Sequence, residues 1–219
     1  MQNGQAVVLG VEKSAGARSW VMRKTDERIS MAMAQRFGLA EAVARLLASR
    51  GVPLEQVSDY LEPKLSALLP DPYVLKDMEK AAQRLSAAIQ SEEKIAVFGD
   101  YDVDGATSSA LLVNYAKALG QDLRLYIPDR MREGYGPNVT AFETLHNEGV
   151  KVIITVDCGT MAHDALDTAL KLGMEVNVAD HHQTGTQMPN CFALVNPKRP
   201  DDESGLGYLA AVGVTFMLI

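Results

Sequence analysis

The sequence predicts an α/β protein, in which a parallel sheet is flanked by helices and a small helical segment precedes the sheet. After Glu93, short runs rich in β-branched residues alternate with segments of helical periodicity, which is the element order of α/β folds. The runs are continuously apolar, as are strands that helices cover on both faces. Aspartates follow three of these runs directly, at the edge where open parallel sheets place their ligands.

Composition and charge limit the class of protein. With 219 residues, 47% of them hydrophobic, the chain can bury one good core and hold a small helical domain beside it. The net charge of −7 disfavours phosphate binding over the whole surface, but it allows a local basic track or a metal-bridged contact with nucleic acid. There is no pattern of a signal peptide or membrane span, and two cysteines cannot form a disulfide framework, so we expect a cytoplasmic protein without membrane contact.

The N-terminal part of the chain is expected to be helical and separate from the sheet. Residues 1–25 lack periodicity and predict a flexible tail, and residues 26–92 predict a helical lead-in. Helical spacing of apolar residues indicates two short helices broken at Gly38 and Gly51, a third helix within residues 53–63 and a fourth over Asp77–Gln90.

Residues 93–219 are expected to form the α/β domain. The runs KIAVFG, LRLYIP, VKVIITVD and MEVNVAD predict four strands, and right-handed crossovers would make them parallel. Asp100, Asp157 and Asp180 each stand at or just past the carboxyl end of one run. We therefore expect three acidic side chains to meet at one edge of the sheet.

The stretch DYDVDG places Asp100, Asp102 and Asp104 at every second position and closes with Gly105. Three carboxylates so close together repel one another, which favours a bound cation. An EF-hand calcium loop is excluded, because its twelfth place needs a bidentate glutamate and this chain has Leu111 there.

Helix capping and phosphate binding account for these aspartates less well than a bound cation does. Asp104 or Thr107 could cap a helix that begins at Ser108, but capping accounts for one aspartate and not for three. No glycine-rich phosphate-binding motif follows any of the runs, which argues against an ordinary nucleotide fold.

Two later motifs complete the acidic edge. ITVDCGT supplies Asp157 and, directly after it, Cys158. A lone cysteine more commonly fills space in an apolar core than acts as a nucleophile. NVADHHQTG supplies Asp180, His181 and His182, and adjacent histidines beside several carboxylates favour metal ligation.

The mixture of aspartate and histidine ligands suits Mn²⁺ or Mg²⁺ better than zinc. With at least four carboxylates available, we expect two ions, one of which activates water while the other stabilises the leaving oxygen of a phosphoryl displacement. The residues themselves thus indicate metal-assisted hydrolysis of a phosphate ester.

The motifs DYDVDG, VDCG and ADHH, in that order, closely resemble the first three motifs of the DHH phosphoesterase superfamily. Four further segments narrow the resemblance to the RecJ family of single-stranded-DNA-specific exonucleases, and this resemblance extends from about Arg36 to the last residue. The segments are LLPDPYVLKDMEKAAQRL, YIPDRMREGYGPN, LVNPKRPD and LAAVGVTFML.

The resemblance implies a set of functional residues. Those that it implies to ligate Mn²⁺ or Mg²⁺ are Asp102, Asp104, Asp157 and His181, with Asp100 as an additional or alternative ligand. Some members of the superfamily have a histidine ligand at the position that Phe98 occupies here, so Asp100 would take more of its role. His182 would face the scissile phosphate.

The segment PDRMREGYG is similar to the family's substrate-facing segment. The resemblance implies that Arg130, Arg132 and Tyr135 contact the backbone or bases of DNA. Without it, the same residues would be interpreted as a solvated loop with an Arg–Glu pair.

The resemblance also implies an activity: a metal-dependent 5′ to 3′ exonuclease on single-stranded DNA, acting in DNA repair and recombination. It implies a single-strand-binding protein and a helicase as partners, and we expect the protein to be a monomer. The alternatives are a DHH-type phosphodiesterase on short oligonucleotides, cyclic dinucleotides or pyrophosphate, and a non-catalytic DHH scaffold. The ligand set argues against the scaffold, because these carboxylates would destabilise an empty site.

Members of the family carry a fourth acidic motif and a second catalytic domain beyond the stretch GVTFML. The resemblance therefore implies that residues 93–219 are a DHH phosphoesterase domain that is incomplete at its C-terminus. On this hypothesis the 219 residues alone lack part of the active site.

Overall fold

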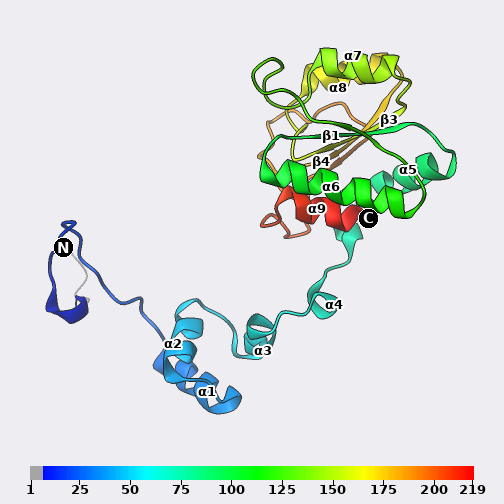
Figure 1. Cartoon of the computed structure of the whole chain (residues 1–219). Coiled ribbons are helices and arrows are strands. Elements are labelled where there is room, and N and C mark those ends of the chain that lie inside the picture. Colours follow the sequence, from blue (N-terminus) through cyan, green and yellow to red (C-terminus); the bar gives the residue numbers. More distant parts are fainter. Residues whose placement is uncertain (1–6) are drawn as a thin grey trace. The chain divides into compact units, whose positions relative to one another are not determined.

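A computed structural model of the chain describes residues 7–219 and divides into two compact units between Leu69 and Pro70 (Figure 1). Of the expected tail, residues 1–6 lie outside the described part. Val7 and Val21 form an isolated antiparallel bridge, and the Val8 amide donates to the Trp20 carbonyl at 2.8 Å. Residues 7–21 therefore form a small loop closed by backbone hydrogen bonds.

The N-terminal unit is helical, as predicted. Its elements are η1 (Val8–Gly10), α1 (Glu27–Phe37), α2 (Glu41–Ser49), η2 (Leu54–Gln56), α3 (Val57–Leu61) and α4 (Leu65–Leu68). Asp26 caps α1 by accepting from the Arg28 amide, and Gly38 ends it in the left-handed conformation, with φ 63°. Met33, Ala44 and Leu47 are buried in its small core, to which α1 and α2 both contribute. The segment 53–63 divides into η2 and α3, and the short α4 is not predicted by the sequence.

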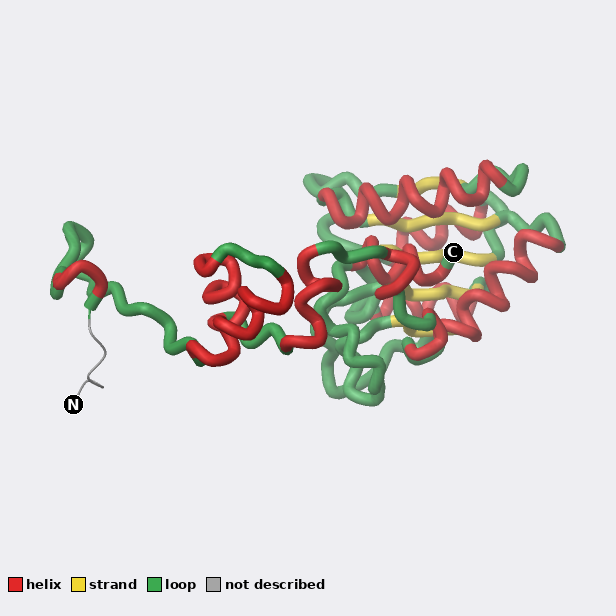
Figure 2. The backbone as a smooth tube through the Cα atoms, turned by 90° about the horizontal axis from the view of Figure 1, so that it is seen from below, coloured by secondary structure: helices red, strands yellow, loops and turns green. Residues whose placement is uncertain are grey.

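The second unit holds a parallel sheet of five strands in the order β2-β1-β3-β4-β5 (Figure 2). Its elements are η3 (Pro72–Val74), α5 (Met78–Gln90), β1 (Ile95–Gly99), α6 (Val103–Ala118), β2 (Arg124–Tyr126), α7 (Val139–Asn147), β3 (Val152–Val156), α8 (His163–Lys171), β4 (Glu175–Ala179), β5 (Ala193–Val195) and α9 (Ala211–Leu218). The predicted α/β class and its four strands are confirmed. The fifth strand, β5, is not predicted, although it is as long as β2 and lies within the apolar run CFALV.

Helices cover both faces of this sheet. One core contains residues of α5, α6 and α9, and the other contains residues of α7 and α8. Successive side chains of a strand point to opposite faces, so Val97 belongs to the first core and Phe98 to the second. Because helices cover both faces, the strands are continuously apolar and do not alternate between apolar and polar residues.

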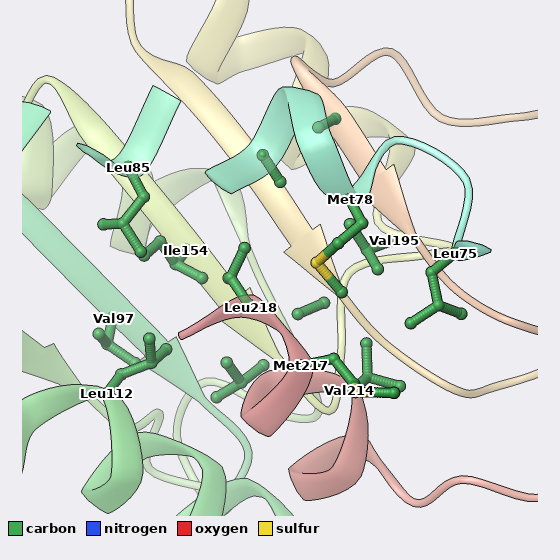
Figure 3. Packing of buried hydrophobic residues seen from close by; sticks show 14 of the residues in the cluster. Leu75, Met78, Leu85, Val97, Leu112, Ile154, Val195, Val214, Met217 and Leu218 are labelled. Carbon is green, nitrogen blue, oxygen red and sulfur yellow. The ribbon is translucent and has the colours of Figure 1, made fainter. Parts of the chain in front are cut away.

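The helix α5 belongs to the sheet unit rather than to the helical lead-in. Its buried residues Met78 and Leu85 lie in one cluster with Ile154 and Val195 of the sheet (Figure 3). The division of the structure at residues 69 and 70 therefore differs from the expected boundary at residues 92 and 93. Periodicity alone shows that α5 is amphipathic, but not which partner its apolar face contacts.

The strand order places a topological switch point between β1 and β3. The chain runs from β1 to β2 on one side and then returns across the sheet to β3, so the two adjacent strands have connections that diverge. Open parallel sheets bind their ligands in the crevice that this divergence leaves at the carboxyl ends. Asp100 follows β1 and Asp157 follows β3, so the fold brings both carboxylates to this crevice.

A charged network fastens the edge strand β5 to the start of α5. The carboxylate of Asp77 accepts from the Leu194 amide at 3.2 Å and from Nη1 of Arg199 at 2.7 Å. Nε of Arg199 also donates to Asp201 at 2.6 Å, and only 9% of the Arg199 side chain is exposed. Asp77 thus satisfies a backbone donor of the edge strand that would otherwise be open for pairing.

We expect Arg199→Met to lower the free energy of unfolding by about 2 kcal/mol, because it removes charge-assisted hydrogen bonds from two carboxylates. Urea denaturation measures this change. The matched control is Arg132→Met, whose side chain is 86% exposed and for which we expect a change within about 0.5 kcal/mol. Equal stability of the two variants would contradict the role of the network.

None of the helices in the described residues combines the length and apolar character needed to cross a membrane.

Candidate metal centre

The first acidic motif forms the turn between β1 and α6. Asp102 is the N-cap of α6, and its Oδ1 accepts from the Gly105 amide at 3.0 Å. The prediction that the helix begins at Ser108 with Asp104 or Thr107 as cap is wrong, because the helix already begins at Val103. The hydroxyl of Thr107 donates to the Val103 carbonyl within the helix, at 2.7 Å. A strand precedes the loop, which confirms that it is not an EF-hand.

Asp104 connects α6 to the last helix of the chain. Its two carboxylate oxygens accept from the amides of Ala211 and Val212, each at 2.8 Å, so Asp104 caps the N-terminus of α9. Its Oδ2 also lies 3.7 Å from Nε2 of His181. Each carboxylate oxygen has a second lone pair, so this capping leaves Asp104 able to bind a cation.

Asp157 lies between the two histidines of the third motif and the aspartates of the first motif. Its Oδ1 lies 3.2 Å from Nε2 of His181 and 4.0 Å from Nδ1 of His182. Asp157, His181 and His182 can place one ligand atom each within 4.8 Å of one another, and so can Asp100, Asp102 and Asp157. Asp157 belongs to both sets, so the structure brings together two adjacent groups of ligand atoms that share one carboxylate.

Burial and neighbouring carboxylates shift the pKa values of the aspartates at this centre. Burial, and then the neighbouring carboxylate of Asp102, raises the pKa of Asp157 to about 7. Burial also raises the pKa of Asp100, whereas the hydrogen bond from the Gly105 amide lowers the pKa of Asp102. Repulsion and burial both act against the ionised state of this site.

Two buried oxygens at this centre have no hydrogen-bond donor among the described residues. They are Oδ1 of Asp100 and Oδ1 of Asp157. A buried carboxylate oxygen without a partner is costly, and a divalent cation would supply the missing positive charge. The donor set of carboxylates and imidazole therefore fits Mn²⁺ or Mg²⁺.

The turn 180–182 is built around the buried carboxylate of Asp180. Its Oδ1 accepts from the amides of His181 and His182, at 2.7 and 3.2 Å, and lies 2.7 Å from Nδ1 of His182. Its Oδ2 accepts from the Thr160 amide at 3.1 Å. Although burial opposes it, hydrogen bonds from Thr160 and His182 hold the pKa of Asp180 below its ordinary value. Asp180 therefore positions the two histidines instead of facing the cluster.

A comparison with protein-family models shows the family to which this chain belongs. The model of the DHH family, N-terminal domain, matches residues 94–219, which is more than half of the chain. The chain belongs to the DHH family. The expected fold and the turn 180–182, which carries the motif Asp-His-His, agree with this membership.

Curated DHH relatives and solved structures include the RecJ exonucleases, and the predicted resemblance to RecJ is confirmed. The chain is 36% identical over 204 residues to the single-stranded-DNA-specific exonuclease RecJ of Bacillus subtilis, covering 93% of this chain and 26% of that protein. It is 37% identical over 182 residues to RecJ of Escherichia coli, covering 83% of this chain and 31% of that protein. The chain thus spans about a quarter to a third of the length of these relatives.

Two solved structures support the same family at the level of the fold. RecJ of Thermus thermophilus in complex with Mn²⁺ has a TM-score of 0.71 and 31% identity, covering 90% of this chain and 27% of that one. A second structure, of exonuclease RecJ bound to manganese, has a TM-score of 0.59 and 38% identity, covering 66% of this chain and 36% of that one.

The DHH turn rests on two residues that sequence reasoning did not select. Nδ2 of the buried Asn196 donates to Oγ1 of Thr160 at 3.0 Å and to the His182 carbonyl at 2.9 Å. Asn196 directly follows β5, so it lies at the same carboxyl edge as the aspartates. Recognising the run before it as a strand would have placed it there.

The three residues expected to contact substrate differ in position. Tyr135 lies at the candidate metal centre, because its hydroxyl donates to the Asp157 carbonyl at 3.4 Å and its ring centroid is 6.3 Å from that of His182. The guanidinium of Arg130 lies 4.9 Å from the ring centroid of Tyr101, beside the first motif. Arg132 is exposed, and its nearest acidic partner is Asp129, at 3.8 Å.

Cys158 behaves as the buried filler that the sequence favours. Only 1% of its surface is exposed, and burial raises the pKa of its thiol well above the ordinary value. Both features are those of a structural cysteine rather than of a nucleophile.

Proposed function

We propose that this chain forms the metal-binding part of the active site of an exonuclease that removes nucleotides from the 5′ end of single-stranded DNA with Mn²⁺ or Mg²⁺. The observation that carries the proposal is a pair of buried oxygens, Oδ1 of Asp100 and Oδ1 of Asp157, at the switch point of the sheet. Among the described residues neither accepts a hydrogen bond, and Nε2 of His181 lies 3.2 Å from the Asp157 oxygen. The relatives' names, which specify single-stranded DNA and exonuclease activity, support the substrate class.

The two groups of ligand atoms would hold two ions. We assign Asp102, Asp104, Asp157 and His181 as ligands, with Asp100 completing the set in place of the superfamily histidine that Phe98 replaces. Such ions, when bound, lower the pKa of a water molecule and neutralise charge on phosphoryl oxygens. The near-neutral pKa of Asp157 without a cation supports this assignment, since a cation would favour its ionised form.

His182 is assigned to the scissile phosphate. Asp180 occupies its Nδ1, so Nε2 is the ring nitrogen left to donate a hydrogen bond to a phosphate or leaving-group oxygen. Although burial opposes it, the hydrogen bond to Asp180 raises the pKa of His182, which favours the protonated, donating form. About half of the His182 side chain is exposed, so it is accessible to substrate.

Arg130 and Tyr135 are proposed to contact the strand beside the scissile bond, Arg130 through phosphate and Tyr135 through its ring. Arg132 is proposed to contact phosphates farther along, because its side chain is exposed. In the cell we propose a cytoplasmic monomer that acts in DNA repair and recombination with a single-strand-binding protein and a helicase.

Asp102→Asn tests the proposal without removing the helix cap, because asparagine caps as well as aspartate does. We expect it to weaken Mn²⁺ binding by at least about tenfold, since the affinity of such sites depends on the number of charged ligands. Calorimetric titration of the chain with MnCl₂ measures this change. Asp102→Ala should lose the same affinity and, in addition, about 1 kcal/mol of stability.

Release of nucleotides from a 5′-labelled strand, single or annealed to its complement, tests the substrate class. We expect the full-length protein to show single-strand-dependent release that Asp102→Asn abolishes, because the resemblance implies that residues 93–219 alone lack part of the active site. Mn²⁺ affinity that Asp102→Asn leaves unchanged would contradict the metal assignment, and hydrolysis of cyclic dinucleotides in place of long strands would favour the other DHH phosphodiesterase activity.

A further inference from the structure

A cavity of about 350 Å³ opens beside His182, on the side of the metal centre formed by β3 and the start of α8. It is lined by Tyr135, Gly136, Pro137, Cys158, Gly159, Thr160, Met161, Ala162, Asp180 and His182. None of the residues assigned above as metal ligands lines it. Its volume lies at the lower end of the range of small-molecule sites, roughly 300–1,000 Å³, which suits one nucleotide better than several.

Met161 forms an exposed apolar wall of this cavity. Although Met161 is large and apolar, 55% of its surface is exposed directly beside a charged centre. Its side chain reaches across to the loop that follows the DHH turn, since a Cβ on Gly185 would lie 3.1 Å from Cε of Met161. Methionine is flexible and polarisable, which suits a surface that must accept different partners.

Apart from Nε2 of His182, which is assigned to the scissile phosphate, the polar side-chain groups of Asp180 and Thr160 in this cavity already have hydrogen-bond partners. Asp180 accepts from three backbone amides, and Oγ1 of Thr160 accepts from Asn196. The thiol of Cys158 is buried. Few side-chain groups are therefore left to read the edge of a base, so the cavity does not select one base over another.

Tyr135 supplies an aromatic surface at the mouth of the cavity. Its ring meets that of His182 nearly edge-on, at an interplanar angle of 82°, and 57% of its surface is exposed. Stacking on an aromatic ring tolerates every base, because each base has a π-face. Because His182 also lines the cavity, its occupant would contact the residue assigned to the scissile phosphate.

We propose that this cavity holds the sugar and base of the nucleotide whose phosphate lies at the metal centre, with Met161 as the residue that contacts the base. This inference rests on the proposed function. It predicts recognition by shape and apolar contact, hence sequence-independent removal of nucleotides.

Binding of a mononucleotide and of inorganic phosphate to the Mn²⁺-loaded chain tests the inference. We expect dTMP and dAMP to bind with similar affinity, each more tightly than inorganic phosphate. Met161→Trp fills the cavity and should weaken dTMP binding on the order of tenfold, the scale of one base contact, while the Kd values of Mn²⁺ and phosphate stay within about twofold. Met161→Ala, which removes the wall without adding bulk, should also weaken dTMP binding and should leave the Kd values of Mn²⁺ and phosphate within about twofold.

Met31→Trp is the matched control, because Met31 is 60% exposed in the N-terminal unit, and it should change none of the three affinities. Unchanged dTMP binding in both Met161 variants would overturn the inference alone, and so would a failure of dTMP to bind more tightly than phosphate. A wild-type chain that does not bind Mn²⁺ would overturn the proposed function and this inference with it.

Discussion

Asp157→Asn is expected to abolish tight Mn²⁺ binding and, at the same time, to stabilise the metal-free chain. Asp157 belongs to both groups of ligand atoms, so its loss affects both proposed ions. In the metal-free fold its carboxylate is buried beside Asp102, and its pKa is raised to about 7, so the ionised group is destabilising. Since one unit of pKa shift corresponds to about 1.4 kcal/mol, removing this charge should raise the free energy of unfolding by at least about 1 kcal/mol at pH 8.

Thermal denaturation with and without Mn²⁺ measures both effects. At a metal concentration of 100 Kd, the wild-type chain should gain about 2.7 kcal/mol of stability, and Asp157→Asn should gain close to none. Asp122→Asn is the control, because Asp122 is exposed in the same unit and outside the centre. A variant that gains as much from Mn²⁺ as the wild-type chain would show that Asp157 is not a ligand.

Gly105→Ala is expected to disrupt the whole first motif, although it adds only a methyl group. A Cβ at this position would lie 2.5 Å from the carbonyl oxygen of Asp100 and 2.7 Å from its amide nitrogen. Because these are backbone atoms, the first turn of α6 or the loop before it must move. Overpacking of this kind typically costs about 1–3 kcal/mol, and here it would also displace the carboxylates of Asp100 and Asp102.

Urea denaturation and Mn²⁺ calorimetry are the two measurements for Gly105→Ala. We expect stability to fall by about 2 kcal/mol and Mn²⁺ affinity to fall at least on the order of tenfold. The control is Gly207→Ala, where the nearest atom to the new Cβ would be the Pro197 carbonyl oxygen at 3.8 Å, an ordinary contact. Wild-type behaviour of Gly105→Ala in both measurements would exclude the close approach of α6 to Asp100.

Several features of the site followed from the sequence because they are local. Asp100, Asp102 and Asp104 share one short loop, so covalent connection alone keeps them close. The positions of Asp157 and of the DHH turn followed from strand ends that a short apolar run reveals. The strand β5 lies in such a run, CFALV, but the run was not recognised as a strand, and Asn196, which supports the DHH turn, was missed with it.

The role of an individual carboxylate can depend on a contact between distant segments. Asp104 and Asp102 are two residues apart in one motif, yet Asp104 caps α9 and Asp102 caps α6. Asp180 was expected at the rim, but backbone amides and His182 engage it. The donors that reach Asp104 come from α9, which the first motif does not contain, whereas Asp102 accepts from Gly105 of its own motif.

The sequence by itself determined the class of fold, the three motifs and the kind of chemistry, because periodicity and residue type are local properties. Only the tertiary structure decided that β1 and β3 are neighbours, that α5 packs on the sheet, and that Met161 forms a wall beside the centre. Strand order and helix docking are set by the burial of complementary apolar faces over long sequence separations. Asp157 therefore joins Asp100 and Asp102 only in the folded chain, although all three are visible in the sequence.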